Sequence, residues 1–168
     1  MKNFSFILLL CAITLFSCTG KKKDATQQRE EAIAEFRSHL TEADTTAMLK
    51  ICDDAMEMLK QKKYDAVLAS LYEYNDSTKE VKPLSDTTAK KYKRRFEMFP
   101  VLSYYRIYYS FQLEGCNDVK YRVTFATAEA AQTKEDPTTA YMFNPVKVDG
   151  SWKLCVKTAK DEFDHSHR

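Results

Sequence analysis

The spacing of apolar residues changes from a helical to a strand period near Pro100, and this change strongly constrains the fold. Before Pro100, apolar residues recur every three or four positions, as in amphipathic helices. After it, apolar and polar residues alternate over 102–114 and again over 119–125, as in strands with one buried face. Helices first and strands last predict an α+β domain, with N-terminal helices packed on one face of a twisted antiparallel sheet of about four long strands.

Helices are expected at three or four places before Pro100. The first follows a capping-box pattern at Asp24 and Gln27, the second begins at Asp44 or Thr45, and the last begins at Ser85 or Asp86. Apolar spacing also resumes over 64–72, which fits a bent continuation of the second helix or, as we favour, a separate short helix after a break at 61–63. The second helix is expected to bury Met48, Ile51, Cys52, Ala55 and Leu59 and to expose Lys50, Asp53, Asp54 and Lys60.

Two hairpins are expected after Pro100. If the first turn centres on Cys116, the apolar side chains of both strands fall on one face. Asp149-Gly150 favours a tight turn between strands over 140–148 and 151–158, with Pro145 at an edge or bulge because it cannot donate a ladder hydrogen bond. Residues 74–84, which include a possible short strand at 80–82, and residues 128–138 are expected to be loops. The expected pairs of the first hairpin are Leu113 with Val119, Phe111 with Tyr121, Tyr109 with Val123 and Ile107 with Phe125.

The first 17 residues predict a cleaved export signal. Apolar residues run from 4 to 16, a length typical of a signal peptide and short of the about 20 residues that span a membrane. Leu15, Ser17 and Cys18 resemble the lipobox of bacterial lipoproteins, although bulky Phe16 departs from it. That resemblance implies a signal peptide over 1–17, a diacylglyceryl group on Cys18 and, because Thr19 follows, an anchor in the outer membrane that faces the periplasm. Simple secretion, with an incidental Cys18, is the alternative.

The rest of the chain is expected to form a lipidated tether over 18–25, a single α+β domain over 26–158 and a polar tail over 159–168. Without the leader about 150 residues remain, which suits one domain. The formal net charge of the chain is +2, and removal of Lys2 brings it close to neutral, so we expect no nucleic-acid partner. A mobile tail with Glu162, Asp164, His165 and His167 offers no fixed geometry, so we expect neither a metal nor a cofactor.

Three cysteines remain once Cys11 is removed with the leader and Cys18 is assigned to lipid. Since three is an odd number, at least one thiol is unpaired within the chain. Cys52 lies on an apolar helix face and is expected to be a small buried hydrophobic residue. Cys116 with Cys155 is the one disulfide considered.

The order of elements resembles the nuclear transport factor two-like superfamily, which includes exported bacterial lipoprotein domains of unknown function; a cystatin-like arrangement is the alternative. The resemblance rests on residues 49–71, where a Lys-Lys-Tyr64-Asp65 break separates two helical stretches, and on the Val-Asp-Gly-Ser-Trp-Lys-Leu sequence within 146–156. It implies a cone-like domain with a cavity between the helices and the concave sheet, which some members use for isomerase or hydratase chemistry.

The sequence leaves three functions open. The first is a lipid-anchored envelope protein that binds a small ligand or a partner without chemistry, and the second is an enzyme with a tyrosine, Arg106 or Arg122 as electrophile. The third is a structural accessory that joins an envelope complex through exposed Tyr104 and Tyr108. No catalytic residue is assigned, because the expected inner face has neither a histidine nor a carboxylate. The candidate cavity-lining residues, which could equally be plain core, are Tyr105, Tyr109, Phe111, Tyr121 and Phe125.

Overall fold

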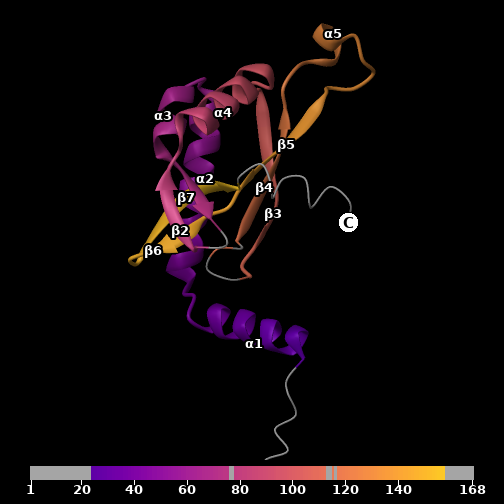
Figure 1. Ribbon diagram of the computed structural model, residues 1–168. Helices are drawn as coiled ribbons and strands as arrows, with labels where there is room; N and C mark the ends of the chain where they lie inside the picture. Colours follow the sequence, from indigo (N-terminus) through magenta and orange to yellow (C-terminus); the bar gives the residue numbers. More distant parts are fainter. Residues whose placement is uncertain (1–23, 76–77, 113–114, 116, 158–168) are drawn as a thin grey trace, which may run out of the picture. The chain divides into compact units, whose positions relative to one another are not determined.

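The computed structural model describes residues 24–75, 78–112, 115 and 117–157, so the assignments made for the leader, Cys18, Cys116 and the tail lie outside the described residues. The contacts divide the chain into a unit that ends at Glu31 and a second unit that begins at Ala32. Of the first unit, the structure describes the opening turns of α1. The end of α1 and all later elements belong to the second unit, which is an α+β domain, as predicted (Figure 1).

The helices begin and end close to the predicted positions. Thr41, rather than Asp44 or Thr45, caps α2, and Asp44 completes a capping box by accepting a hydrogen bond from the Thr41 N–H. The predicted break at 61–63 is confirmed, and Lys62 has a φ of 59° there. Ser85 caps α4, because its hydroxyl accepts a hydrogen bond from the Thr88 N–H. The helices are α1 (Ala25–Ser38), α2 (Glu42–Lys60), α3 (Tyr64–Ser70), α4 (Asp86–Met98) and α5 (Ala128–Ala131).

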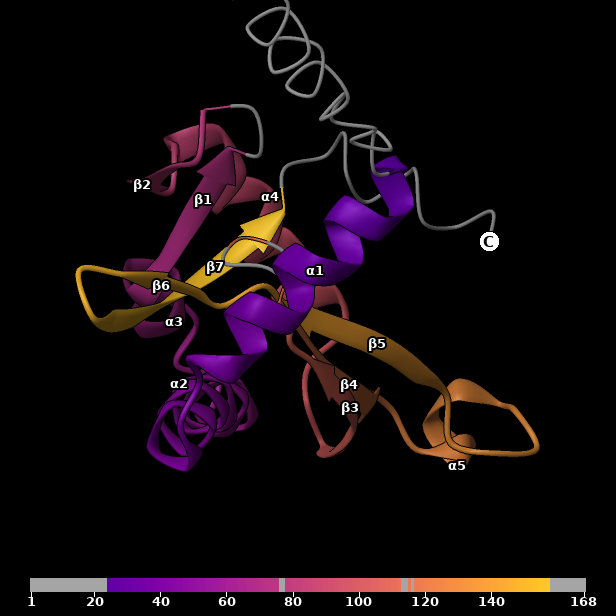
Figure 2. The ribbon, with the colours of Figure 1, turned by 90° about the horizontal axis from the view of Figure 1, so that it is seen from below.

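The strands form two sheets, one with the order β2-β1-β7-β6 and one with the order β3-β4-β5. In Figure 2 these two groups of strands lie apart, with β1, β6 and β7 in one and β3 to β5 in the other. All pairs are antiparallel except β1 with β7, which is parallel and was not predicted. The strands are β1 (Leu71–Asn75), β2 (Glu80–Pro83), β3 (Ser103–Ser110), β4 (Asp118–Thr124), β5 (Thr138–Phe143), β6 (Val146–Val148) and β7 (Ser151–Lys157).

The predicted strand over 140–148 is in fact two strands, because the chain passes from one sheet to the other at Asn144 and Pro145. Asn144 is buried, and its N–H donates to the Cys155 carbonyl at 2.8 Å. The Nδ2 of buried Asn117 donates to the Pro145 carbonyl at 3.0 Å, and the Nδ2 of Asn144 donates to the Asn117 carbonyl at 3.1 Å. These amide side chains satisfy backbone groups at the crossing that no ladder pairs.

The β3–β4 hairpin is confirmed, but its predicted register is wrong. Tyr109 pairs with Val119, and Tyr104, not Tyr109, pairs with Val123. The register shifts between Arg106 and Tyr108, so Ile107 is the extra residue of a β-bulge. Beyond a bulge, side chains that would face inward by alternation face outward instead. The alternation of apolar and polar residues in the sequence therefore cannot predict the faces on both sides of a bulge.

One hydrophobic core joins α2, α3 and α4 to both sheets. Met48, Cys52 and Leu59 of α2 are fully buried, as the predicted stripe requires, and Cys52 is a free thiol. Cys155 is also buried and free, so the disulfide considered for it does not form in this structure. Other core members are Val67, Leu71, Tyr92, Phe96, Val119, Tyr121, Val123, Tyr141, Phe143, Leu154 and Val156.

Candidate functional site: a cavity beside β6

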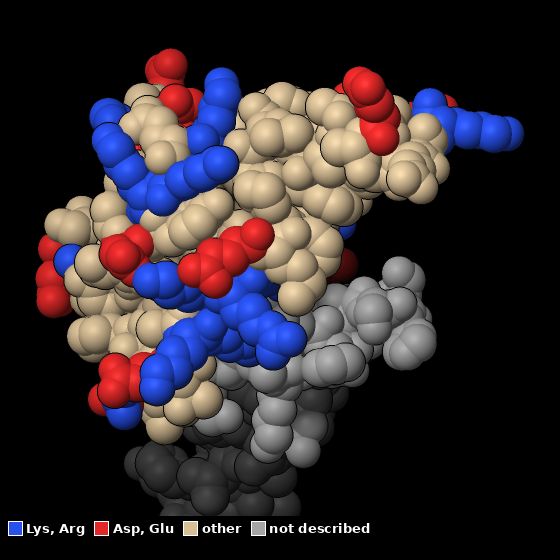
Figure 3. Space-filling view, turned by 90° about the horizontal axis from the view of Figure 1, so that it is seen from above, with Lys and Arg blue, Asp and Glu red and all other residues tan. Residues whose placement is uncertain are grey.

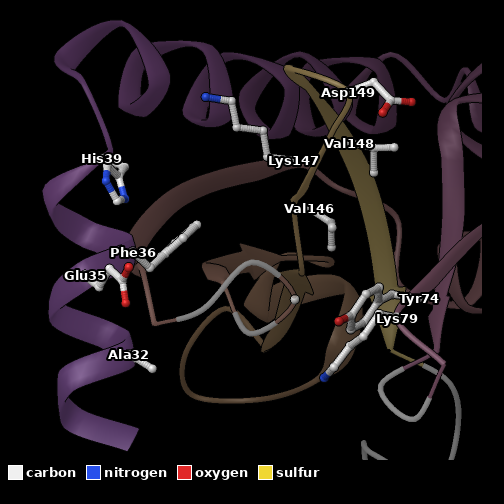
Figure 4. A pocket seen from close by; sticks show the side chains of 11 residues that line it. Ala32, Glu35, Phe36, His39, Tyr74, Lys79, Val146, Lys147, Val148 and Asp149 are labelled. Carbon is white, nitrogen blue, oxygen red and sulfur yellow. The ribbon is translucent and has the colours of Figure 1, made fainter. Parts of the chain in front are cut away.

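A cavity of about 660 Å³ lies between the second half of α1 and strands β1 and β6. Figure 4 shows its lining side chains, with those of α1 on one side and those of β6 and Tyr74 facing them. Its volume is within the about 300–1,000 Å³ range of small-molecule sites. Its lining residues are Ala32, Glu35, Phe36, His39, Tyr74, Lys79, Gly115, Val146, Lys147, Val148 and Asp149.

The α1 wall of the cavity follows from helical spacing. Ala32 and Phe36 lie four residues apart and therefore share one face of the helix, and His39 follows directly after the helix ends at Ser38. A hydrogen bond of 2.6 Å from the Arg37 Nε to the Phe111 carbonyl fixes this part of α1 against the chain that follows β3. Phe36 gives the wall an aromatic surface, and His39 adds an imidazole at its edge (Figure 4).

The opposite wall is set by the tight β6–β7 turn, which the sequence predicted. Asp149 and Gly150 have φ values of 48° and 76°, so both central turn residues are left-handed, as a type I′ hairpin requires. The turn presents Val146, Lys147 and Val148 to the cavity. This wall therefore combines aliphatic side chains with a cation.

Lys147 is held by an ion pair with the start of α2. Its Nζ lies 2.5 Å from the Asp44 Oδ1. The hydrogen bond from Lys147, followed by those from the Thr41 N–H and hydroxyl, holds the pKa of Asp44 well below its usual range. The ammonium group is thereby placed at the cavity wall by a carboxylate that is itself part of a helix cap.

Tyr74 and Gly115 are in close contact at the cavity. A Cβ on residue 115 would lie 2.0 Å from the Tyr74 hydroxyl oxygen, so any other residue there would have to displace the Tyr74 ring. The Lys79 ammonium lies 5.8 Å from the centre of the Tyr74 ring, within cation–π range. Aromatic, aliphatic and charged groups thus meet in one open cavity.

A second polar cluster lies between α2 and the β3–β4 hairpin. Asp53, predicted to face outward, instead faces these strands and accepts a hydrogen bond of 2.6 Å from the Tyr121 hydroxyl. The Arg106 guanidinium donates to the other carboxylate oxygen at 2.5 Å. Both oxygens of Asp53 are therefore engaged by side chains of the hairpin.

The phenols of Tyr121 and Tyr104, near Asp53, both have raised pKa values. Burial and the hydrogen bond to Asp53 raise the pKa of Tyr121 far above its usual value. Burial and the nearby Glu57 carboxylate raise the pKa of Tyr104. The cluster therefore acts as an electrostatic tie between α2 and the sheet, with Asp53 as its anion.

The structure does not place the five predicted cavity-lining residues on one inner face. Tyr105 and Tyr109 are 59% and 46% exposed, whereas Tyr121 is fully buried in the core. Phe111 is partly buried and packs against Trp152, with ring centres 6.0 Å apart, and Phe125 packs against Phe99 at 5.0 Å. For Tyr105 the cause is the bulge at Ile107, which places this residue opposite outward-facing Arg122, whereas Tyr109 stays opposite buried Val119.

The cavity residues were not predicted as a site from the sequence. The signals that were present are the α1 spacing of Ala32 and Phe36 and the Asp149-Gly150 turn. Neither signal indicates that a helix at one end of the chain and a hairpin at the other share a cavity, because that depends on the unpredicted parallel pairing of β1 with β7.

The basic residues of α4 lie in a surface of mixed charge. Figure 3 shows Lys and Arg side chains gathered on one part of the molecule with Asp and Glu side chains among them. The Lys93 Nζ lies 2.8 Å from the Asp65 carboxylate of α3, and Arg95 donates to the Ala140 carbonyl at 3.2 Å. These contacts fit the expected solvated helix face.

Within residues 24–75, 78–112, 115 and 117–157, no three His, Cys, Asp or Glu side chains gather to form a possible metal site. None of the helices in these ranges has the length and apolar composition needed to cross a bilayer.

Comparison with solved structures gives neighbours with the NTF2-like fold. A Campylobacter jejuni protein with the description NTF2-like transpeptidase is 12% identical, with 64% of this chain and 96% of that chain covered and a TM-score of 0.40. An NTF-2-like protein of unknown function from Shewanella oneidensis is 14% identical, with 68% and 98% covered and a TM-score of 0.40. The β subunit of benzoate 1,2-dioxygenase from Burkholderia mallei is 12% identical, with 73% and 93% covered and a TM-score of 0.31.

No protein-family model matches the chain, and no curated protein matches it. Similarities at these identities and TM-scores assign neither a family nor an activity to it. The structure itself shows the class of the fold, an α+β domain with a cavity at β6.

Proposed function

We propose that this protein is a lipid-anchored component of the bacterial cell envelope whose domain binds a small ligand in the cavity beside β6 without catalysing a reaction. The proposal of ligand binding is supported by the cavity itself. It has a volume of about 660 Å³, an aromatic and aliphatic lining and a few charged groups at its walls. Such a combination buries the body of a ligand and orients it through few polar contacts.

The lining supports an amphipathic ligand. Phe36, Tyr74 and Val146 offer apolar surface, while the ammonium group of Lys79 and that of Lys147, which is paired with Asp44, give the walls positive charge. An aromatic or aliphatic molecule with an anionic group fits these two kinds of surface.

The anchor is proposed on the sequence alone. The apolar run over 4–16 that ends in Leu15, Ser17 and Cys18 supports cleavage before Cys18 and attachment of lipid to its thiol. More than one acyl chain gives stable membrane attachment, since each buried methylene contributes about 0.8 kcal/mol. Thr19 supports the outer membrane, with the domain in the periplasm, as its location.

The ligand site is tested with 1-anilinonaphthalene-8-sulfonate, an apolar aromatic anion whose fluorescence rises on transfer from water. We expect saturable binding to one site, weakened at least about tenfold by Ala32→Trp, which fills the cavity from α1; tenfold corresponds to about 1.4 kcal/mol. Ala34→Trp is the matched control, because Ala34 is exposed on the same helix and does not line the cavity. Equal effects of the two substitutions, or no saturable binding, would contradict the proposal.

The anchor is tested by intact-mass analysis of the membrane fraction from cells that express the wild type or Cys18→Ser. We expect a diacylglyceryl adduct on a chain that begins at Cys18 in the wild type, and no such adduct in the variant. A wild type recovered unmodified from the soluble fraction would remove the anchor and leave the cavity test unaffected.

A further inference from the structure

Exposed apolar side chains are concentrated on one short stretch of the described chain. The large hydrophobic residues that remain exposed all lie between residues 98 and 109, and four of them are on β3. Exposed apolar side chains that gather on one element of a folded domain point to an interaction site. The exposed set is Met98, Leu102, Tyr105, Ile107, Tyr108 and Tyr109.

The bulge at Ile107 organises part of this surface into pairs of a tyrosine and a cation. On β4, Lys120 and Arg122 alternate with the buried Val119, Tyr121 and Val123, so the two cations point away from the core. Across the strand, the register places Tyr105 directly opposite Arg122 and Tyr108 directly opposite Lys120. Residues opposite each other share a face, so both pairs lie on the outer side of the sheet.

These pairs present aromatic surface and positive charge together. The Lys120 ammonium lies 6.0 Å from the centre of the Tyr108 ring. Arg122 is exposed and forms no ion pair with the described residues. Unlike Arg106, which is neutralised by Asp53, the two outer cations are available to an anion from outside.

β3 also lies at the edge of its sheet. β3 is the first strand of the β3-β4-β5 sheet, and among the described strands it pairs with β4 alone. An edge strand presents unpaired N–H and C=O groups, which an extended peptide can use by adding a further strand. The tyrosine and cation pairs then lie beside the added strand and select its side chains.

We infer that the β3 edge and the adjoining outer face, defined by Tyr105, Tyr108, Lys120 and Arg122, bind an extended acidic segment of another protein. The edge supplies hydrogen bonds that depend on no particular sequence, and the two cations select carboxylates. The inference does not depend on the ligand proposed above, because none of these residues lines the cavity.

A second copy of this chain fits the surface less well. Two copies that met face to face about a twofold axis would bring the same patch of each together. Lys120 and Arg122 of one copy would then be desolvated beside those of the other, with a cost from like charges. Positive charge on both sides therefore favours a partner of opposite sign.

The test uses the full chain and a fluorescent peptide of 8 residues, the length of β3, that alternates glutamate with valine. We expect saturable binding by fluorescence anisotropy and amide chemical-shift changes centred on Ser103–Ser110. A lysine–valine peptide of the same length should bind at least about tenfold more weakly. The glutamate–valine peptide with N-methyl groups on alternate residues should also lose binding, because it cannot form the ladder hydrogen bonds.

Variants distinguish peptide binding at this surface from general electrostatic attraction to the protein. Lys120→Glu with Arg122→Glu should weaken peptide binding at least about tenfold, and Tyr105→Ser with Tyr108→Ser should weaken it too. Lys90→Glu with Arg94→Glu is the control, because it makes the same change in charge at exposed positions of α4. Far-UV circular dichroism of each variant checks that the fold is kept. The chemical-shift map is measured on the wild type, so it does not depend on the folding of any variant.

Three results would overturn the inference. The first is equal weakening by the β4 and α4 charge reversals, and the second is a chemical-shift map that lies away from β3. The third is failure of the acidic peptide to bind, together with binding of the protein to anionic phospholipid vesicles, to RNA or, in ultracentrifugation, to a second copy of the chain.

Discussion

Tyr121 and Tyr141 are neighbouring buried phenols in the β4–β5 register, and they differ in the charge of their acceptors. The Tyr121 hydroxyl donates to the Asp53 carboxylate at 2.6 Å, whereas the Tyr141 hydroxyl donates to the neutral Phe99 carbonyl at 2.6 Å. Hydrogen bonds to a charged group contribute about 1.5–3 kcal/mol, and neutral ones about 0.5–1.5 kcal/mol.

We therefore expect Tyr121→Phe to lower the free energy of unfolding by about 1.5–3 kcal/mol and Tyr141→Phe by about half as much. Urea unfolding measures both. A smaller loss for Tyr121→Phe than for Tyr141→Phe would show that Asp53 does not stabilise the folded state through this contact.

Asp44 gives the protein a predictable response to acid. Its folded pKa is lowered by Lys147 and Thr41, so the ionised carboxylate stabilises the folded state above the unfolded pKa of about 4. That contribution is lost as the pH falls from about 4 toward the folded pKa. Asp44→Asn should be less stable than wild type at neutral pH, and the difference should narrow below about pH 4.

The measurement is the thermal unfolding midpoint of both proteins from neutral to acidic pH. Asp54→Asn is the control, because Asp54 pairs with Lys50 on an exposed helix surface where ion pairs contribute little. A difference between Asp44→Asn and wild type that stays constant down to the lowest pH would contradict the assignment.

At the scale of elements, the break between α2 and α3 depends on one residue in a costly conformation. Lys62 has a φ of 59°, which a residue with a Cβ adopts at a cost of roughly 1–2 kcal/mol. Lys62→Gly should therefore raise the free energy of unfolding by up to about 1 kcal/mol, part of the gain being offset by the greater entropy of the unfolded chain.

Lys63→Gly is the matched control, because Lys63 has a φ of −82° and gains nothing from glycine. Denaturant unfolding of the two variants should change stability in opposite directions. A loss of stability in both variants would mean that the Lys62 side chain makes contacts that outweigh its backbone strain.

Elements with strong local signals could be predicted from the sequence, and elements defined by distant pairing could not. The Ser85 cap, the 61–63 break and the Asp149-Gly150 turn are each set within a few residues, and the structure confirms them. β1 was missed because its residues also fit a helical period, and its strand is defined by pairing with β7 far along the chain. The strand propensity of a short segment does not indicate which distant strand it pairs with.

The residues of the candidate site could be predicted from the sequence even less well than the elements. The sequence indicated that tyrosines of the first hairpin mattered, but it placed Tyr105 inside, whereas the side chain is 59% exposed. The cavity near β6 is formed by residues of α1, β1 and the last hairpin. No local pattern marks residues that meet only in the folded domain.

At the largest scale, a hydrophobic core shared by both sheets of the second unit implies that these sheets unfold together. Cys52 of α2 lies in this core and Cys155 of β7 lies in a smaller cluster with Tyr74 and Val146, and both are buried free thiols. Burial raises the pKa of Cys155 to about 12 and raises the pKa of Cys52 further still. Since the thiolate is the reactive species, both thiols should resist iodoacetamide in the native protein and react once it unfolds.

Mass spectrometry of proteolytic peptides follows alkylation of the two thiols separately. We expect the two rates to rise together with added urea, because the thiols are exposed by one transition. The fully denatured chain serves as the control for intrinsic reactivity. Rapid alkylation of Cys155 alone under native conditions would mean that β7 opens independently of the α2 core.

The bulge at Ile107 also affects which changes in length the gene can tolerate. Loss of one codon inside a strand normally turns every later side chain to the opposite face. Here Arg106 pairs with Tyr121 and Tyr108 pairs with Lys120, so deletion of Ile107 would leave an unbroken ladder and keep each flanking side chain on its present side. This strand can therefore lose a residue in mid-course during evolution and retain both its core and its outer tyrosines.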